Sequence, residues 1–242
     1  MDYTAADCLR ARKDFPALHR VGDGPALAFL DGPGGSQVPL PVIAAIQDVY
    51  ATCNVNTHGN FPPSREVDRR MDEARRTVAE FLGAADPACI SFGQNMTTLN
   101  FSLSAAIGRT LQAGDEILIT QLDHEANRGP WLRLGAQGIV IQEVRLLPSG
   151  ELDLADMAAK ITARTKVFAL GASSNALGTV NDIALARRMT RQVGALLVLD
   201  AVHYAPHFLV DVEALGADFL DDWRDALLTG DGLRKLAEKD SR

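Results

Sequence analysis

The sequence has few cysteines, no long apolar run and no excess of basic residues. Its 3 cysteines, Cys8, Cys53 and Cys89, are scattered, so they indicate neither a metal knuckle nor a CxxC redox pair. Their odd number fits a reducing compartment. No apolar stretch approaches the roughly 20 residues of a membrane-spanning helix. The first residues are polar and charged, unlike a secretory signal, so we expect a cytoplasmic protein.

The charge balance also excludes some classes of partner. The formal net charge is -7, which argues against a nucleic-acid or anionic-membrane binder, because such proteins present basic patches. A small anionic ligand stays possible, since a few local donors can hold it. The 242 residues are 47% hydrophobic and 23% charged, which is typical of a globular protein with one large domain or slightly more.

Short apolar runs alternate with longer amphipathic stretches along most of the chain. The expected strands are residues 26–31, 89–92, 116–122, 138–144, 166–172 and 195–200. The runs ILIT, VFAL and LLVL are continuously apolar, which favours strands buried on both faces of a mostly parallel sheet. The alternation predicts a layered α/β fold.

Helices are expected at residues 64–83, 97–108, 125–135, 153–163 and 182–194. In the first, Val67, Met71, Ala74, Val78 and Leu82 form one apolar stripe. Ser64 is expected to cap this helix at its start and Gly83 to end it. After residue 219 the sequence becomes a charged tail in which no further strand is expected.

Two candidate ligand sites follow strands, where open α/β sheets bind ligands. The turn Gly93-Gln94-Asn95-Met96-Thr97-Thr98 precedes a helix, so its hydroxyls and free N–H groups could cradle a phosphate. Taken alone, however, the turn favours a plain loop and helix cap, since threonine is a common cap. His124 follows the next strand and could stack on a flat ring or transfer protons, or could simply be a loop histidine.

Two further strands end in candidate residues. Asn175 could present its amide to a ligand, or could be a turn residue beside Gly178. Asp200 closes an apolar strand, where a carboxylate could keep the ring nitrogen of pyridoxal 5'-phosphate (PLP) protonated, or could cap the next segment. A zinc site on His203 and His207 is disfavoured because Pro206 interrupts the helix it would need, and no metal is expected.

Several segments resemble the cysteine desulfurases and class V aminotransferases, a PLP-dependent family. The similar stretches are GQNMTTLN, DHEANRGPW, SNALGT, LLVLDAVHYAPH, FLDGPGGSQVP and NVNTHGNFPPS, within about residues 15–219. The resemblance implies a three-layer α/β/α fold with a mostly parallel central sheet, and a homodimer that acts on a small amino acid such as L-cysteine.

The resemblance also implies a role for each matching residue. Thr97 would contact the phosphate, with Asn95, Met96 and Thr98 as neighbouring donors, and His124 would stack on the ring as the catalytic histidine. Asn175 would bond near the phenolic oxygen or the substrate carboxylate, Asp200 would hold the ring nitrogen, and His203 would reach the phenolic oxygen.

The sequence departs from the family where the Schiff-base lysine is expected. No lysine occurs between Lys166 and Lys235, and Lys235 and Lys239 lie in a charged pattern typical of a solvated helix. We therefore expect an N-terminal segment (1–25), an incomplete PLP-binding large domain (26–219) and a divergent charged tail (220–242), with the C-terminal small domain missing.

That departure leaves two alternatives to a competent enzyme. The hypothesis is that the chain is truncated before the lysine and impaired in catalysis, because the lysine tethers PLP and moves protons at the substrate. The alternative is a non-catalytic PLP-binding or dimerising fragment. A nicotinamide-binding fold is disfavoured, since Gly32-Pro33-Gly34-Gly35 does not match GxGxxG.

Overall fold

The chain divides into two compact units, and the boundary between them falls within one long helix. A computed structural model describes residues 4–19, 28–221 and 226–228. The units are Met1–Glu73 and Ala74–Arg242, and helix α3 (Pro62–Leu82) contributes to both. Among the described residues, no helix has the length and apolar character needed to cross a membrane.

The second unit is built on one sheet, whose strands lie in the order β1-β7-β6-β5-β4-β2-β3. Neighbouring strands from β3 to β6 pair in parallel, whereas β7 pairs antiparallel with both β6 and β1. The strands are β1 (Ile90–Ser91), β2 (Glu116–Thr120), β3 (Val140–Val144), β4 (Thr165–Gly171), β5 (Leu196–Asp200), β6 (Phe219–Asp221) and β7 (Ala226–Leu228). The predicted mostly parallel α/β sheet is confirmed.

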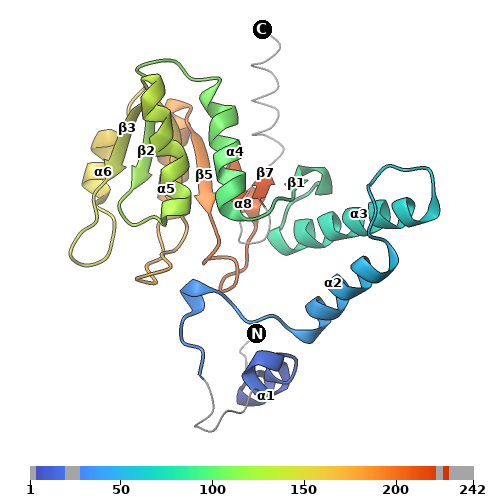
Figure 1. The fold of residues 1–242 in the computed structure, drawn as a ribbon. Coiled ribbons are helices and arrows are strands. Elements are labelled where there is room, and N and C mark those ends of the chain that lie inside the picture. Colours follow the sequence, from blue (N-terminus) through green and yellow to red (C-terminus); the bar gives the residue numbers. More distant parts are fainter. Residues whose placement is uncertain (1–3, 20–27, 222–225, 229–242) are drawn as a thin grey trace. The chain divides into compact units, whose positions relative to one another are not determined.

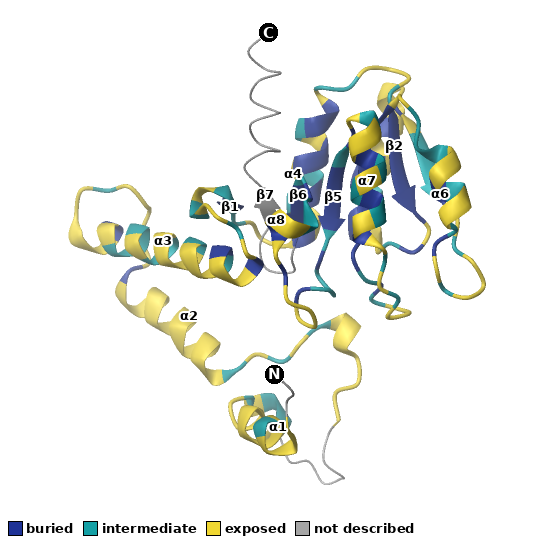
Figure 2. Cartoon of the chain, turned by 180° about the vertical axis from the view of Figure 1, so that it is seen from behind, coloured by how far each residue is buried: buried dark blue, intermediate teal, exposed yellow. Residues whose placement is uncertain are grey.

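Helices cover both faces of this sheet, which confirms the three-layer arrangement (Figures 1 and 2). Helices α4 (Met96–Gly108) and α5 (Glu125–Leu132), with the 3₁₀ helix η4 (Arg133–Gln137), pack on one face. Helices α6 (Leu154–Lys160) and α7 (Ile183–Val193) pack on the other, and α8 (Val212–Leu215) precedes β6.

The two hydrophobic cores follow from the alternation of side chains along each strand. In β5, Leu197 and Leu199 join the core under α6 and α7, whereas Val198 joins the core under α4 and α5. Successive side chains of a strand point to opposite faces, so a strand covered on both sides must be apolar throughout. This explains why ILIT, VFAL and LLVL are continuous apolar runs.

The N-terminal unit contains helices but no strand among its described residues. It holds α1 (Ala5–Arg12), the 3₁₀ helices η1 (Pro16–His19) and η2 (Gly32–Gly34), α2 (Leu40–Thr52) and the first part of α3. Helix α2 buries none of its residues, as Figure 2 shows. Arg70 on α3 pairs with Asp48 on α2, their nitrogen and oxygen 2.7 Å apart, so a surface ion pair joins the two helices.

Three local predictions were wrong. Helix α3 begins at Pro62, since proline suits the first turn of a helix, and Ser64 is the third residue rather than the cap. The Ser64 hydroxyl instead donates to the Asn56 carbonyl. Residues 28–31 form no strand, and 26–27 lie outside the described residues. The segment expected to lack strands contains β6 and β7, because β6 pairs with β5 and β7 pairs with β6 and β1, which satisfies their backbone groups.

Candidate functional site

A pocket lies beyond the carboxyl ends of β2, β4 and β5. Four predicted site residues line it: His124 after β2, Asn175 after β4, Asp200 at the end of β5, and His203 just beyond. Residues from three separate parts of the sequence therefore meet, as expected for the edge of a parallel sheet.

His124 caps helix α5, so its ring is held by the backbone. Its Nδ1 accepts the N–H of Ala126, with 3.1 Å between the nitrogens. A ring nitrogen that accepts a hydrogen bond carries no proton, so Nε2 carries the proton of the neutral ring. The sequence predicted the presence of His124 at the site but missed this capping role, which histidine rarely fills.

Asp200 and His203 bring a carboxyl group and an imidazole to the same pocket. The Oδ1 atom of Asp200 accepts the backbone N–H of Val202 at 3.0 Å, which fixes the carboxylate at the end of β5. Burial lowers the pKa of His203, and the nearby His124 and His207 lower it further. His203 is therefore uncharged at neutral pH, and a neutral imidazole can both donate and accept a hydrogen bond.

The predicted phosphate turn forms the N-terminus of α4. Asn95 caps this helix, and its Oδ1 accepts both the N–H and the hydroxyl of Thr98, at 2.9 and 3.0 Å. Met96 is buried, whereas Thr97 is exposed and its hydroxyl bonds no other described residue. These residues do not line the pocket around Asp200.

Buried asparagines place the phosphate turn near the pocket. The side-chain amide of Asn100 on α4 donates to the carbonyl oxygen of Ala126 and to Oδ1 of Asn127, each at 3.1 Å. Both acceptors lie in the first turn of α5, so α4 and α5 run side by side at their N-termini, as Figure 1 shows. Two helix N-termini, each electropositive, therefore lie at the same edge of the sheet.

Asp123 is a site residue that the sequence did not predict. Its Oδ1 accepts the N–H of Gly171 at 2.6 Å, while its buried Oδ2 has no hydrogen-bond partner within the described part of the chain. Burial raises the pKa of Asp123 to about 7 against the lowering effect of the Gly171 bond, and the charge of Asp200 adds to the rise. The available signal was a carboxylate at a strand end, directly before His124.

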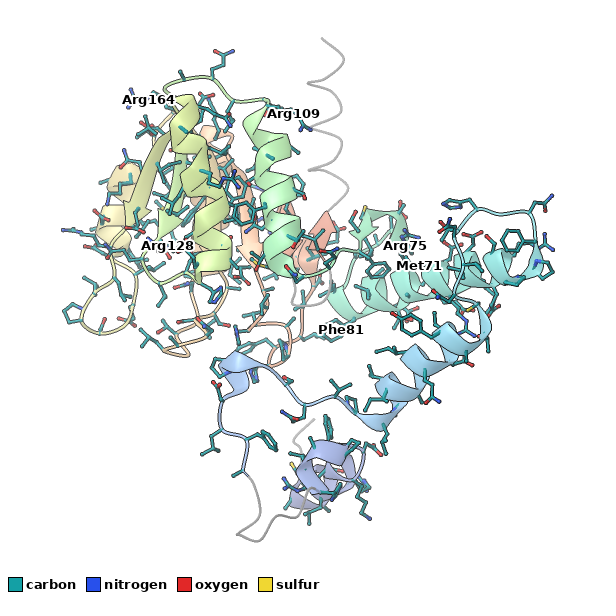
Figure 3. The ribbon with its side chains drawn as sticks, in the orientation of Figure 1. Met71, Arg75, Phe81, Arg109, Arg128 and Arg164 are labelled. Atoms are coloured by element: carbon teal, nitrogen blue, oxygen red, sulfur yellow. The ribbon has the colours of Figure 1, made fainter. Side chains whose placement is uncertain are left out.

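No lysine within residues 4–19 and 28–221 lines the pocket. Lys160 donates to Asp156 at 2.7 Å and to the carbonyl of Glu143 at 2.6 Å. Lys166 lies at the start of β4, at the opposite end of the sheet, near Arg164 (Figure 3). The candidate residues Lys235 and Lys239 lie outside the described residues.

Comparison with known proteins gives a consistent family. The aminotransferase class-V profile matches residues 28–221. A cysteine desulfurase from Dickeya dadantii is 36% identical over 213 residues, which are 87% of this chain and 52% of that protein. A probable cysteine desulfurase from Streptomyces coelicolor is 36% identical over 220 residues, covering 86% of this chain and 52% of that protein. The chain thus spans about half the length of the curated relatives it matches.

Solved structures give the same answer for the fold. The apo structure of a cysteine desulfurase from Thermococcus onnurineus aligns with a TM-score of 0.82 and 28% identity, over 92% of this chain and 57% of that one. A cysteine desulfurase from Escherichia coli aligns with a TM-score of 0.81 and 27% identity, over 99% and 60%. The profile match extends over most of the sheet and its helices, and it ends at the last residue of β6. The chain belongs to the class-V aminotransferase family, together with the cysteine desulfurases.

Proposed function

We propose that this chain binds PLP in the pocket at the ends of β2, β4 and β5. The observation that carries the proposal is that His124, Asn175, Asp200 and His203 line one pocket, although they come from separate strands. The neighbouring N-terminus of α4, with the exposed hydroxyl of Thr97, offers donors for a phosphate.

The chemistry of these side chains fits the cofactor. A carboxylate at Asp200 would keep a pyridine nitrogen protonated, and the capped ring of His124 offers a flat face with a fixed orientation. The uncharged His203 and the amide of Asn175 would donate to ring or substrate oxygens. When bound, PLP supplies an electron sink for reactions at the α-carbon of an amino acid.

We infer that the ancestral reaction is the removal of sulfur from L-cysteine. The support is that the relatives from Dickeya dadantii and Streptomyces coelicolor carry that activity in their names. We propose that turnover by this chain is impaired, because no lysine in its described parts reaches the pocket to tether PLP or to move protons.

The second candidate function is a PLP-binding or dimerising protein without catalysis, acting in the cytoplasm. The absence of a pocket lysine among the described residues favours it, and so does the surface of α2, whose apolar side chains include the exposed Ile43, Ile46 and Tyr50. An exposed apolar surface of this kind is typical of an interface, and a homodimer would cover it.

One titration tests cofactor binding and chemistry together. PLP is added to the protein while the visible absorbance band is followed, and L-cysteine or L-alanine is added afterwards. Saturable binding that is weakened at least tenfold by Asp200→Asn supports the PLP site, whereas wild-type protein that binds no PLP contradicts it. Asp86→Asn is a matched control, because Asp86 is an exposed cap of the 3₁₀ helix η3 (Pro87–Cys89) that does not line the pocket, and asparagine also caps well.

The same sample tests whether turnover by this chain is impaired. Borohydride reduction followed by mass spectrometry would find no PLP adduct on a lysine of the chain, and L-cysteine would release no sulfide. An adduct together with sulfide release would contradict impairment and favour a competent desulfurase. A band that neither amino acid shifts would favour the non-catalytic alternative.

A further inference from the structure

The carboxyl group of Asp123 occupies a space that exists because residue 171 is glycine. A Cβ atom at Gly171 would lie 2.5 Å from Oδ1 of Asp123, closer than non-bonded atoms approach. The same Oδ1 accepts the Gly171 N–H at 2.6 Å. One carboxyl group therefore fixes the loop after β2 to the last residue of β4. Any side chain at position 171 would displace that carboxyl group.

This arrangement brings Asp123 close to Asp200. Gly171 pairs with Asp200 in the register of β4 and β5, so Asp123 is bonded to the residue next to Asp200 across the sheet. Both carboxyl groups line the pocket. Among the described residues, further titratable groups near this edge include His124, His203 and His207, and also Asp221, which pairs with Asp200 in the register of β5 and β6.

The environment of Asp123 sets the charge of its carboxyl group. Its Oδ2 atom is buried and has no partner among the described residues, so an ionised carboxylate is poorly stabilised there. The charge of Asp200 disfavours a second negative charge nearby, and together these effects raise the pKa of Asp123 to about 7. Below pH 7, Asp123 therefore mostly carries a proton.

We propose that Asp123 is a positioning residue of the cofactor site, which fixes the end of β4 beside Asp200 and releases its proton when a cationic ring binds against Asp200. The proposal rests on the proposed function, because it takes the ring to be that of PLP. The positive charge of the ring nitrogen would offset the negative charge of Asp200. The repulsion that favours the protonated form of Asp123 would therefore weaken. The released proton goes to solvent, and no bond other than the O–H bond of Asp123 breaks.

The test compares the pH dependence of PLP affinity in the wild type and in Asp123→Asn. If binding releases a proton from Asp123, wild-type affinity rises with pH up to about 7, whereas the asparagine variant has no such proton. The titrations of PLP itself affect both proteins equally. We expect the ratio of wild-type to variant association constants to rise at least threefold between pH 5.5 and pH 8.

Two further variants separate this role from a merely structural one. Gly171→Ala keeps Asp123 but fills the space of its carboxyl group, so the affinity of this variant should also lack the rise with pH. The ratio of wild-type to variant association constants should then rise as it does for Asp123→Asn. Asp86→Asn should leave the ratio flat at 1, since it changes a carboxylate that does not line the pocket. Circular dichroism of each variant shows whether it folds.

A second readout needs no cofactor. Carbon-13 NMR of aspartate-labelled protein should show one carboxyl that titrates near pH 7, is absent from Asp123→Asn, and moves to lower pH in Asp200→Asn. Absence of that signal would overturn the role, as would normal PLP binding with a flat ratio. Wild-type protein that binds no PLP would overturn the proposed function, and this role with it, even if the NMR signal is present.

Discussion

Asn100 on α4 donates its side-chain amide to Oδ1 of Asn127 on α5 across 3.1 Å, and both side chains are fully buried. The same amide reaches the carbonyl oxygen of Ala126. These bonds join two helices whose N-termini lie beside the candidate pocket. Buried polar groups are costly without partners, so this pair sets how α4 and α5 lie next to each other.

Asn100→Ala is expected to destabilise the protein and to weaken phosphate binding. The change leaves the Asn127 and Ala126 oxygens without their donor, which costs about 1–3 kcal/mol of unfolding free energy. Urea unfolding followed by circular dichroism measures this loss. Ser102→Ala on the exposed side of α4 is the control, and its effect should stay within about 0.5 kcal/mol. Equal effects of the two changes would contradict the role of the buried pair.

The second prediction concerns Asp221. Burial raises the pKa of its carboxyl group, and the charge of Asp200 raises it further. In the unfolded chain this carboxyl group has an ordinary pKa near 3.8 and releases its proton above pH 4. In the folded protein the same group keeps its proton to a higher pH. This contribution to stability is complete below pH 4 and is lost as the pH rises through the raised folded pKa. Asp221→Asn cannot ionise, so it should be more stable than the wild type at pH 8.

The size of this effect follows from linkage. Each unit by which the folded pKa exceeds the unfolded one is worth about 1.4 kcal/mol, so the stability gain of Asp221→Asn should be at least that much larger at pH 8 than at pH 4. Urea unfolding at the two pH values measures the difference. A gain that is the same at both would show that Asp221 keeps an ordinary pKa in the folded protein.

Periodicity predicted those parts of the fold in which burial dictates the residue type. Strands β2, β4 and β5 were found because both of their faces are covered, which requires uninterrupted apolar runs. Strand β6 was missed because it is short and ends in the buried Asp221, a residue that strands disfavour. Its pairing with β5 and β7, which is a tertiary contact, makes this segment a strand.

The site was predictable to the extent that it depends on strand ends. His124, Asn175, Asp200 and His203 line one pocket because the ends of parallel strands converge. Asp123 was not identified, since its importance depends on the space above Gly171, and a sequence does not show which distant glycine a side chain covers. The individual role of each residue toward PLP stays a prediction.

A third prediction tests how α3 ends. Gly83 has a φ of 67°, and Ala84 returns its N–H to the Ala79 carbonyl at 2.9 Å, as the sequence predicted for a glycine stop. Alanine there would be strained, and its Cβ would lie 2.9 Å from the Cα of Asp211. Gly83→Ala should therefore lower the unfolding free energy by about 1–2 kcal/mol from strain alone, and further from the contact.

A matched glycine separates strain from contact in that experiment. Gly194 ends α7 with a φ of 70°, but a Cβ there would meet no atom within 4 Å. Gly194→Ala should thus lose only the strain component. If chemical denaturation shows equal losses for the two variants, then the approach of Asp211 to Gly83 contributes nothing.

The last prediction separates the two roles assigned to His124, which caps α5 and would stack on the cofactor ring. Asparagine is a good N-cap but offers no ring, so His124→Asn should keep thermal stability while weakening PLP binding at least tenfold. His124→Ala loses both, and the lost cap costs about 1 kcal/mol. Because the Ala126 N–H bonds Nδ1 in the wild type, the stability difference between the two variants reports the cap, while their common loss of affinity reports the ring. If His124→Asn binds PLP as tightly as the wild type, the histidine serves the helix alone.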